Sequence, residues 1–365
     1  MDRRIPDRIP LMCQMSIGHM LVQLGVSPAE FWHDARVFAD GLVTLRTLYD
    51  FDGILVSLHG HDPDWQSSIA SRERNQDGEK IVWNNGDSTF YPNDDLPLHS
   101  ASQNLRTNTQ GIETPGQLPD TLDYIPVSQG LHFHISPRHR FDIFDFVREK
   151  SGSEYSIHGE VTSPFDYYLD LVGYQVGLMM LIDSPGRAKE ILAHFSRLVC
   201  SLGVDMCRKG IDAVKISSPF AGAGFISPSF YEEFVVPYER EVALAVRNQG
   251  VHVYTHTCGA IDDRLELMFE SGISGIECLD PPPLGNVELD DAMKRIGDKG
   301  FVKGNIDSVN ILLMGTTDQI QADAKKRIEI GRRYGGFILS TACSIAPRVK
   351  PENIRLLREA VERWG

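Results

Sequence analysis

Short apolar runs rich in β-branched residues alternate with amphipathic stretches along most of the chain. Eight runs predict strands, at residues 9–15, 51–57, 154–161, 211–216, 251–255, 273–278, 301–304 and 337–341. The stretches between them carry apolar residues at helical spacing and predict helices at 28–49, 140–150, 164–209 in pieces, 227–248, 262–270, 289–296, 317–333 and 351–363. Alternation of this kind is typical of parallel βαβ units, and about eight units predict an α/β fold, a (β/α)8 TIM barrel.

The alternation is interrupted after the second predicted strand. Residues 58–137 are rich in His, Asp, Asn, Ser and Pro, and only the passage IVWNNGDSTFY predicts a hairpin, turning at Asn85–Gly86. A loop of this length is typically a functional lid or a disordered segment. We therefore expect one TIM-barrel domain over 1–365, with 58–137 as a lid-like insertion over the carboxyl ends of the strands. Four aromatic residues favour an ordered lid, namely Trp65, Trp83, Phe90 and Tyr91.

Metal-binding side chains follow two predicted strands where each strand ends. The run VHVYTHTCG (251–259) ends in His256 and Cys258, which are two apart and so point to the same face of an extended chain. The run GFILSTAC (336–343) ends in Cys343. One imidazole and two thiolates suit Zn2+ and leave one coordination position open for chemistry. The alternative is that both cysteines are ordinary buried thiols, which is common for this residue.

Composition narrows the class of protein. The 365 residues are 42% hydrophobic, enough for a large core, and the net charge of −14 argues against nucleic-acid binding. No apolar run is long enough for a membrane helix, and the N-terminus lacks the apolar region of a signal peptide. Six cysteines without framework spacing fit a reducing, cytoplasmic location. The sequence allows a homodimer but does not decide between it and a monomer.

Other residues near strand ends are weaker candidates for the active site. Glu277 lies near the end of the run ISGIEC and is a candidate catalytic group, either as a displaceable fourth metal ligand or as a hydrogen-bond partner of the site. A helix cap or loop carboxylate is the alternative. Asn305 is a candidate to line the pocket, although asparagine more often holds loop backbone. Cys278 alternates with Glu277 in the strand, so we expect it to be a packed thiol.

Several residues are candidates for substrate binding. His132 lies in LHFHIS near the base of the insertion, and His158 shares a strand face with Glu160. Tyr167 begins a helix at the predicted active face. For each of them the alternative is ordinary packing or a buried, satisfied side chain.

Five segments in the second half carry a resemblance to a known family. They are GEVTSPFDYYLDLVG (159–173), GIDAVKISSPFAGAGFISPSFYEEFVVPY (210–238), HTCGAIDDRLELMFESGISGIECLD (256–280), VKGNIDSVNILLMGTTDQI (302–320) and GGFILSTACSIAPRVKPENIRLL (335–357). The chain resembles the uroporphyrinogen decarboxylase superfamily and, within it, the zinc-dependent corrinoid methyltransferases. That branch carries H-x-C and a distant C, so the resemblance implies that His256, Cys258 and Cys343 bind zinc.

The resemblance also implies an activity. We expect transfer of a methyl group from a methoxylated aromatic to the Co(I) of a cobalamin (corrinoid) cofactor on a partner protein, with zinc polarising the ether oxygen. This chain has no evident corrinoid-binding domain of its own. Methylation of a thiol by methylcobalamin is the first alternative, and a non-enzymatic zinc-binding relative is another. A decarboxylase is disfavoured because IPLMCQMSIGHM lacks the arginine that the decarboxylases carry there.

Overall fold

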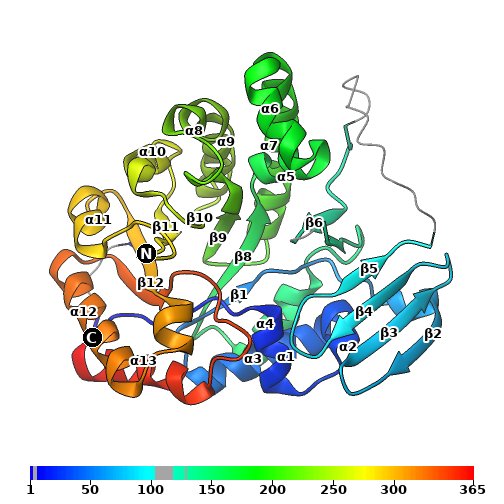
Figure 1. Cartoon of the computed structure of the whole chain (residues 1–365), viewed down its shortest axis with the longest axis horizontal. Coiled ribbons are helices and arrows are strands. Elements are labelled where there is room, and N and C mark those ends of the chain that lie inside the picture. Colours follow the sequence, from blue (N-terminus) through cyan, green and yellow to red (C-terminus); the bar gives the residue numbers. More distant parts are fainter. Residues whose placement is uncertain (3–5, 103–117, 128–129) are drawn as a thin grey trace.

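Seven parallel strands form the central sheet of the computed structural model, which describes residues 1–2, 6–102, 118–127 and 130–365. Helices surround the sheet (Figure 1), and the fold is that of a TIM-like barrel, as predicted. The strands follow chain order around the sheet, as β1 (Gly53–Val56), β8 (Ser156–Thr162), β9 (Ala213–Ser217), β10 (His252–Thr257), β11 (Gly275–Cys278), β12 (Phe301–Ile306) and β13 (Phe337–Thr341).

The eighth predicted strand is an extended segment without a regular ladder. Residues 9–15 make two isolated parallel bridges to β13 and the residues after it. The backbone N–H of Met12 donates to Leu339 at 3.0 Å, and the N–H of Asp52, just before β1, donates to Leu11 at 2.8 Å. The segment therefore connects β13 to β1 and completes the ring that the seven strands leave open.

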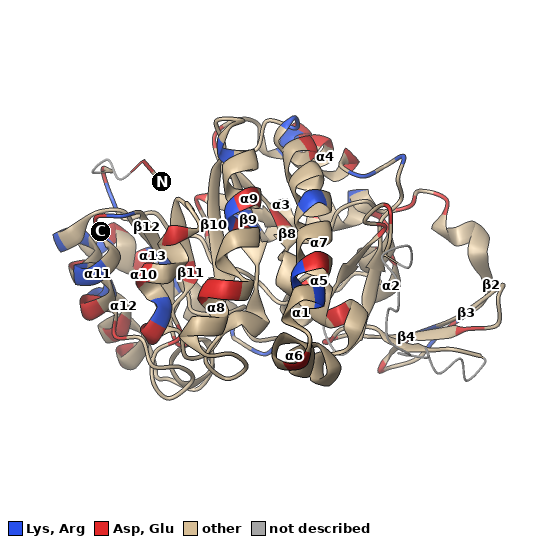
Figure 2. Cartoon of the chain, turned by 90° about the horizontal axis from the view of Figure 1, so that it is seen from above, with Lys and Arg blue, Asp and Glu red and all other residues tan. Residues whose placement is uncertain are grey.

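The outer layer consists of helices whose polar faces carry both signs of charge, as α7, α9 and α11 show (Figure 2). Most begin where the sequence predicts, but the helix expected over 28–49 divides at Asp34. The Asp34 carboxylate accepts hydrogen bonds from the backbone of Arg36 and Val37 and so begins a new helix. The helices are α1 (Ile17–Leu24), α2 (Pro28–His33), α3 (Ala35–Tyr49), α4 (Asp142–Ser151), α5 (Pro164–Val172), α6 (Tyr174–Asp183), α7 (Pro185–Cys207), α8 (Pro228–Phe234), α9 (Val236–Arg247), α10 (Leu265–Glu270), α11 (Leu289–Ile296), α12 (Thr317–Tyr334) and α13 (Pro351–Trp364).

The insertion after β1 contains more regular structure than its sequence predicts. The hairpin that turns at Asn85–Gly86 is confirmed, because β3 and β4 pair in antiparallel register on either side of it. Two further strands extend this hairpin into a four-stranded sheet that packs against α2. The strands are β2 (Ile69–Arg74), β3 (Gly78–Trp83), β4 (Ser88–Pro92) and β5 (Leu98–Ser100), and a second pair is β6 (Tyr124–Pro126) with β7 (His132–His134).

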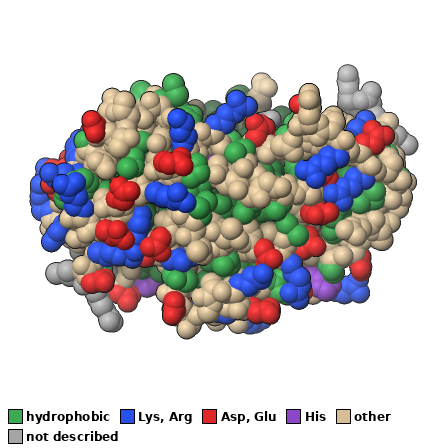
Figure 3. Space-filling model, turned by 90° about the horizontal axis from the view of Figure 1, so that it is seen from below, with side chains coloured by type: hydrophobic (Ala, Val, Ile, Leu, Met, Phe, Trp, Pro, Cys, Tyr) green, Lys and Arg blue, Asp and Glu red, His purple; other side chains and the backbone are tan. Residues whose placement is uncertain are grey.

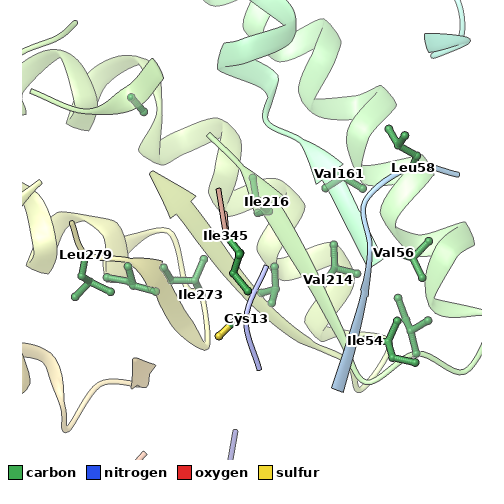
Figure 4. Close-up of a cluster of buried hydrophobic side chains, with 14 of the residues drawn as sticks. Cys13, Ile54, Val56, Leu58, Val161, Val214, Ile216, Ile273, Leu279 and Ile345 are labelled. Atoms are coloured by element: carbon green, nitrogen blue, oxygen red, sulfur yellow. The ribbon is translucent and has the colours of Figure 1, made fainter. Parts of the chain in front are cut away.

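Alternation along the barrel strands separates an apolar outer face from an unusually polar interior. Figure 4 shows apolar side chains such as Val56, Val161, Val214 and Ile216, which belong to the main hydrophobic core. Lys215 lies between Val214 and Ile216 in β9, so its side chain points the opposite way, toward the barrel axis. The interior near the strand starts is closed by a smaller apolar cluster of Met12, Ala213, Tyr254, Phe301 and Ile338.

The surface mixes charges of both signs. In Figure 3, acidic and basic side chains are interspersed on the face shown, with hydrophobic side chains between them. Within the described residues, none of the helices combines the length and apolar character that a membrane crossing requires.

The burial of Glu239 in α9 can be tested by the pH dependence of the free energy of unfolding. Burial raises its pKa to about 8, and nearby Asp166 adds to the shift while Ser218 opposes it. Between the ordinary pKa of glutamate, about 4.3, and about 8, the folded chain keeps a proton that the unfolded chain has lost, so stability falls as pH rises. The contribution of Glu239 is about 1.4 kcal/mol for each pH unit.

We therefore expect Glu239→Gln to flatten the decline in the free energy of unfolding between about pH 5 and 8, by about that slope. Urea unfolding at several pH values measures it. Glu232→Gln, at an exposed position of α8, is the matched control and should keep the wild-type slope. Equal slopes for wild type and Glu239→Gln would contradict the assignment.

Candidate metal centre

A histidine and two cysteines meet at the carboxyl ends of β10 and β11. His256 lies in β10, Cys258 is the first residue after that strand, and Cys278 is the last residue of β11. One ligand atom from each of these residues lies within 4.8 Å of the others. The Nε2 atom of His256 is 3.3 Å from the Cys258 sulfur. Among the described residues, this is the group of His, Cys, Asp and Glu side chains whose spacing could hold a metal ion.

Cys343, which follows β13, lies against the same group. Its thiol interacts with Cys258, Cys278 and His256. The hydrogen bonds from Cys258 and Cys278, more than any effect of burial, hold the pKa of Cys343 well below its usual range. A thiolate at this position is the form of cysteine that binds metals. The structure thus brings the three predicted ligands together, although they come from two strands far apart in the sequence.

The structure places Cys278 in the cluster, where the sequence indicated only a packed thiol. Its side chain is fully buried, as expected, but the strand alternation that was used to separate it from Glu277 ends at this residue. Cys278 has φ 89° and Leu279 has φ 54°, both in the left-handed region that side chains other than glycine rarely occupy. This change of backbone direction turns the Cys278 sulfur toward Cys258. Strained backbone of this kind is typical of functional sites.

Glu277 contacts the ring nitrogen of His256 that does not face Cys258. Its Oε2 atom lies 3.0 Å from Nδ1 of His256, which leaves Nε2 directed at the cysteines. Glu277 also pairs with two buried lysines, Lys303 and Lys215, the latter at 3.4 Å. Burial alone would favour the neutral acid, but the two lysines outweigh it and hold the pKa of Glu277 well below its ordinary value. A carboxylate that fixes the tautomer of a ligating histidine is a common feature of metal sites.

Lys215 extends this charged network across the barrel interior. Its ammonium donates to Gln14 at 2.5 Å and to Glu160 at 3.3 Å. Burial disfavours the charge, yet Glu160 and Glu277 raise the pKa of Lys215 above its ordinary value. Neither Lys215 nor Lys303 was predicted. The signal was present, because each is a lysine inside an otherwise apolar strand, AVKIS and FVKGNI.

Asn305 is fully buried, and both ends of its amide have partners. Its Nδ2 donates to the Leu279 carbonyl at 2.8 Å, and its Oδ1 accepts from Arg327. Asn305 therefore holds the backbone that follows Cys278. A direct role in catalysis stays a prediction.

Two of the three predicted substrate-binding residues, Tyr167 and His132, contact the same ring, that of Tyr124, with ring centres 5.7 Å and 4.4 Å from it, whereas His158 packs against Tyr254. His158 is 1% exposed, bonded to Tyr254 at 2.9 Å and to Ser156 at 3.0 Å, and burial lowers its pKa to about 3. Tyr167 is buried and donates to the backbone of β6. His132 pairs with Asp170 at 3.0 Å and lines a cavity of the insertion. His158 and Tyr167 have the satisfied environment of packed residues, and only His132 faces open space.

The residues present fit a zinc ion. The donor set is one imidazole nitrogen with its second nitrogen held by a carboxylate, together with three thiols, and zinc prefers these ligands. The loop after the ligands is fixed as well, because Asp280 accepts from the N–H of Gly259 at 2.7 Å and from the Cys278 thiol at 3.2 Å. Three of the four side chains would leave one position open for a substrate.

Comparison with known sequences identifies the class of protein that carries this site. The sequence model of the uroporphyrinogen decarboxylase (URO-D) family matches residues 133–364, so the chain belongs to this family. The matched region includes all strands of the barrel from β8 onward and all four residues of the cluster.

Particular relatives are methyltransferases. The chain is 26% identical over 258 residues to methylcobamide:CoM methyltransferase MtaA of Methanosarcina barkeri, which covers 70% of this chain and 73% of that protein. It is 25% identical over 218 residues to methylcobamide:CoM methyltransferase MtbA of Methanosarcina acetivorans, covering 60% of this chain and 61% of that protein. A solved methyltransferase from Methanosarcina mazei shares the fold, with a TM-score of 0.72 at 18% identity over 99% of this chain and 95% of that one.

Proposed function

We propose that this chain is a zinc-dependent methyltransferase of a corrinoid system, with His256, Cys258 and Cys343 as the metal ligands. The observation that carries the proposal is the His–Cys cluster at the carboxyl ends of barrel strands, in a chain whose relatives include methylcobamide:CoM methyltransferases as well as uroporphyrinogen decarboxylases. Active sites of TIM barrels lie at this face. A bound zinc ion would supply Lewis acidity toward an oxygen or sulfur of the substrate.

The residues around the cluster have separable roles in this proposal. Glu277 is a positioning residue, because it holds Nδ1 of His256 and leaves Nε2 for the metal. Lys303 and Lys215 keep Glu277 ionised. Asp280 and Asn305 hold the two loops that carry Cys258 and Cys278. Cys278 remains beside the three ligands as the fourth side chain of the cluster and its third thiol.

We favour a methoxylated aromatic as the methyl donor and the Co(I) corrinoid of a partner protein as the acceptor. In that reaction the C–O bond of the ether breaks, the Co–C bond forms, and the phenolate keeps the electron pair and takes up a proton. The sequence of the insertion favours this donor because it is rich in aromatic and hydrogen-bonding residues, although Trp65, Trp83 and Tyr91 line a separate cavity. We keep the insertion 58–137 as a lid-like segment of a single domain, and expect the corrinoid protein to dock at the carboxyl face of the strands.

Methylation of a thiol by methylcobalamin is the second candidate. The names of the relatives favour it, since both transfer methyl groups between a methylcobamide and the thiol coenzyme M. A decarboxylase is less well supported. Gln14, in the segment where decarboxylases carry arginine, is bound to Lys215 in the barrel interior.

An anaerobic optical assay tests the proposal. The zinc-loaded protein is mixed with Co(I) cobalamin, free or on a corrinoid protein, and methyl donors are added one at a time. We expect methylcobalamin to form with a methoxyarene, and not when Cys258→Ala or Cys343→Ala replaces the wild type. If no ether reacts but a thiol demethylates methylcobalamin, the second candidate replaces the first.

A further inference from the structure

The insertion contains a cavity of about 470 Å³ that the proposed chemistry does not use. It lies between α2, the four-stranded sheet and β7, and none of the four residues of the metal cluster lines it. Figures 1 and 2 both place β3 and β4 on the opposite side of the molecule from β11 and β12. The cavity is therefore a candidate for a second, separate binding site.

Three of the four tryptophans in the sequence, Trp32, Trp65 and Trp83, line this cavity. Neighbouring side chains hold each of them. The Trp83 indole N–H donates to Thr89 at 2.9 Å, and Trp65 stacks on His33 with ring centres 4.8 Å apart.

The remaining contacts complete a preformed wall. His33 is itself bonded to the Tyr91 hydroxyl at 2.6 Å, and Trp32 meets the edge of Phe133 with ring centres 5.4 Å apart. Preformed aromatic walls of this kind bind flat apolar ligands without first having to be ordered.

His61 is a buried polar group of this wall. It lines the cavity, is only 3% exposed, and neither ring nitrogen has a hydrogen-bond partner among the described residues. Burial lowers its pKa to about 3, so the ring is neutral and offers one donor and one acceptor. Buried polar atoms are normally hydrogen-bonded, because leaving them unpaired costs free energy. A ligand hydroxyl that reached one of these nitrogens would supply the missing partner.

The charges at the cavity restrict the ligand further. In the described part of the chain no Lys or Arg lines it, and its acidic residues are Asp62 and Asp87. The Asp87 carboxylate already accepts hydrogen bonds from the Asn85 side-chain amide and from the backbone N–H of Ser102. The other titratable side chains that face it include His99, His132 and His134. A carboxylate or phosphate ligand would therefore find no permanently charged cation here, so the lining favours a neutral molecule.

From these features we infer that the cavity binds a neutral hydroxylated aromatic, with the ring between the tryptophans and the hydroxyl paired with His61. The site is independent of the metal cluster and of methyl transfer. If the proposed function is correct, the same class includes the phenol that demethylation releases.

Binding of 2-methoxyphenol to the full chain, measured by tryptophan fluorescence and calorimetry, tests the inference. Methoxybenzene, which lacks the hydroxyl, is the matched ligand. We expect His61→Phe to weaken the binding of 2-methoxyphenol about tenfold, as loss of one hydrogen bond predicts. The affinity for methoxybenzene should change by less than about twofold. Both ligands also belong to the class of methyl donor proposed for the metal site, so binding is measured in Cys258→Ala as well as in the wild type. The binding that depends on His61 should persist in Cys258→Ala, so failure of methyl transfer and failure of this site are distinguishable.

Three results would overturn the inference. They are absence of 2-methoxyphenol binding to the wild type, equal binding to wild type and His61→Phe, and displacement by tetramethylammonium, which would indicate a site for cations. If His61→Phe does not fold, as judged by circular dichroism, Trp83→Leu replaces it. That variant should weaken both aromatic ligands, and unchanged affinity for both would likewise overturn the assignment.

Discussion

Cys258→Ala is expected to lose its zinc and all measurable methyl transfer while remaining folded. Cys258 lies 3.3 Å from Nε2 of His256 and within reach of two further thiols, so it is central to the donor set. Loss of an outer partner of a metal ligand costs about 10–100-fold in affinity, and we expect loss of the ligand itself to cost at least about a hundredfold. Metal content after dialysis against a graded chelator series measures the change.

Two control variants make this result specific. Cys200→Ala changes a half-buried cysteine of α7 that lies outside the cluster, and should keep full metal content. Cys278→Ala should keep zinc if His256, Cys258 and Cys343 are the ligands. Zinc retained in Cys258→Ala but lost in Cys278→Ala would contradict the proposed ligand set.

Glu277→Ala is expected to have the largest effect on stability. Glu277 is 1% exposed and is the shared partner of Lys303 and Lys215, both fully buried. Removing it leaves the buried Lys303 ammonium without the carboxylate it pairs with and leaves Lys215 with Glu160 as its carboxylate partner. Breaking a buried pair in this way costs about 3–5 kcal/mol. Urea unfolding of the metal-free protein measures the loss apart from any effect on zinc.

A double variant separates the charge effect from simple loss of packing. Adding Lys303→Met to Glu277→Ala removes the stranded charge, so part of the lost stability should return. The free energy of unfolding is also measured for Lys303→Met alone. If the losses of the two single variants simply add in the double variant, the two residues are not coupled and the charge effect is absent. The zinc affinity of both variants should fall about 10–100-fold, since His256 loses the carboxylate that orients it.

Local sequence signals located most elements of the barrel. Apolar runs bounded by polar residues located the strands, and helical spacing of apolar residues located the helices, because these signals act over a few neighbouring residues. The insertion was predicted less well. Its hairpin has a local turn signal, whereas β2 and β5 are largely exposed strands that form by pairing with that hairpin.

The sequence by itself determined the barrel, the two strand ends that carry His256, Cys258 and Cys343, and the family resemblance, which the family match confirms. The tertiary structure alone decided three further points. It brought Cys278 into the cluster through a backbone turn that strand alternation does not describe. It directed Glu277 to the back of His256 and surrounded it with two lysines from neighbouring strands. It also gathered tryptophans from α2 and the insertion around His61. The physical reason is the same in each case: these contacts join residues distant in sequence, and only the closed barrel and its packed insertion fix which of them meet.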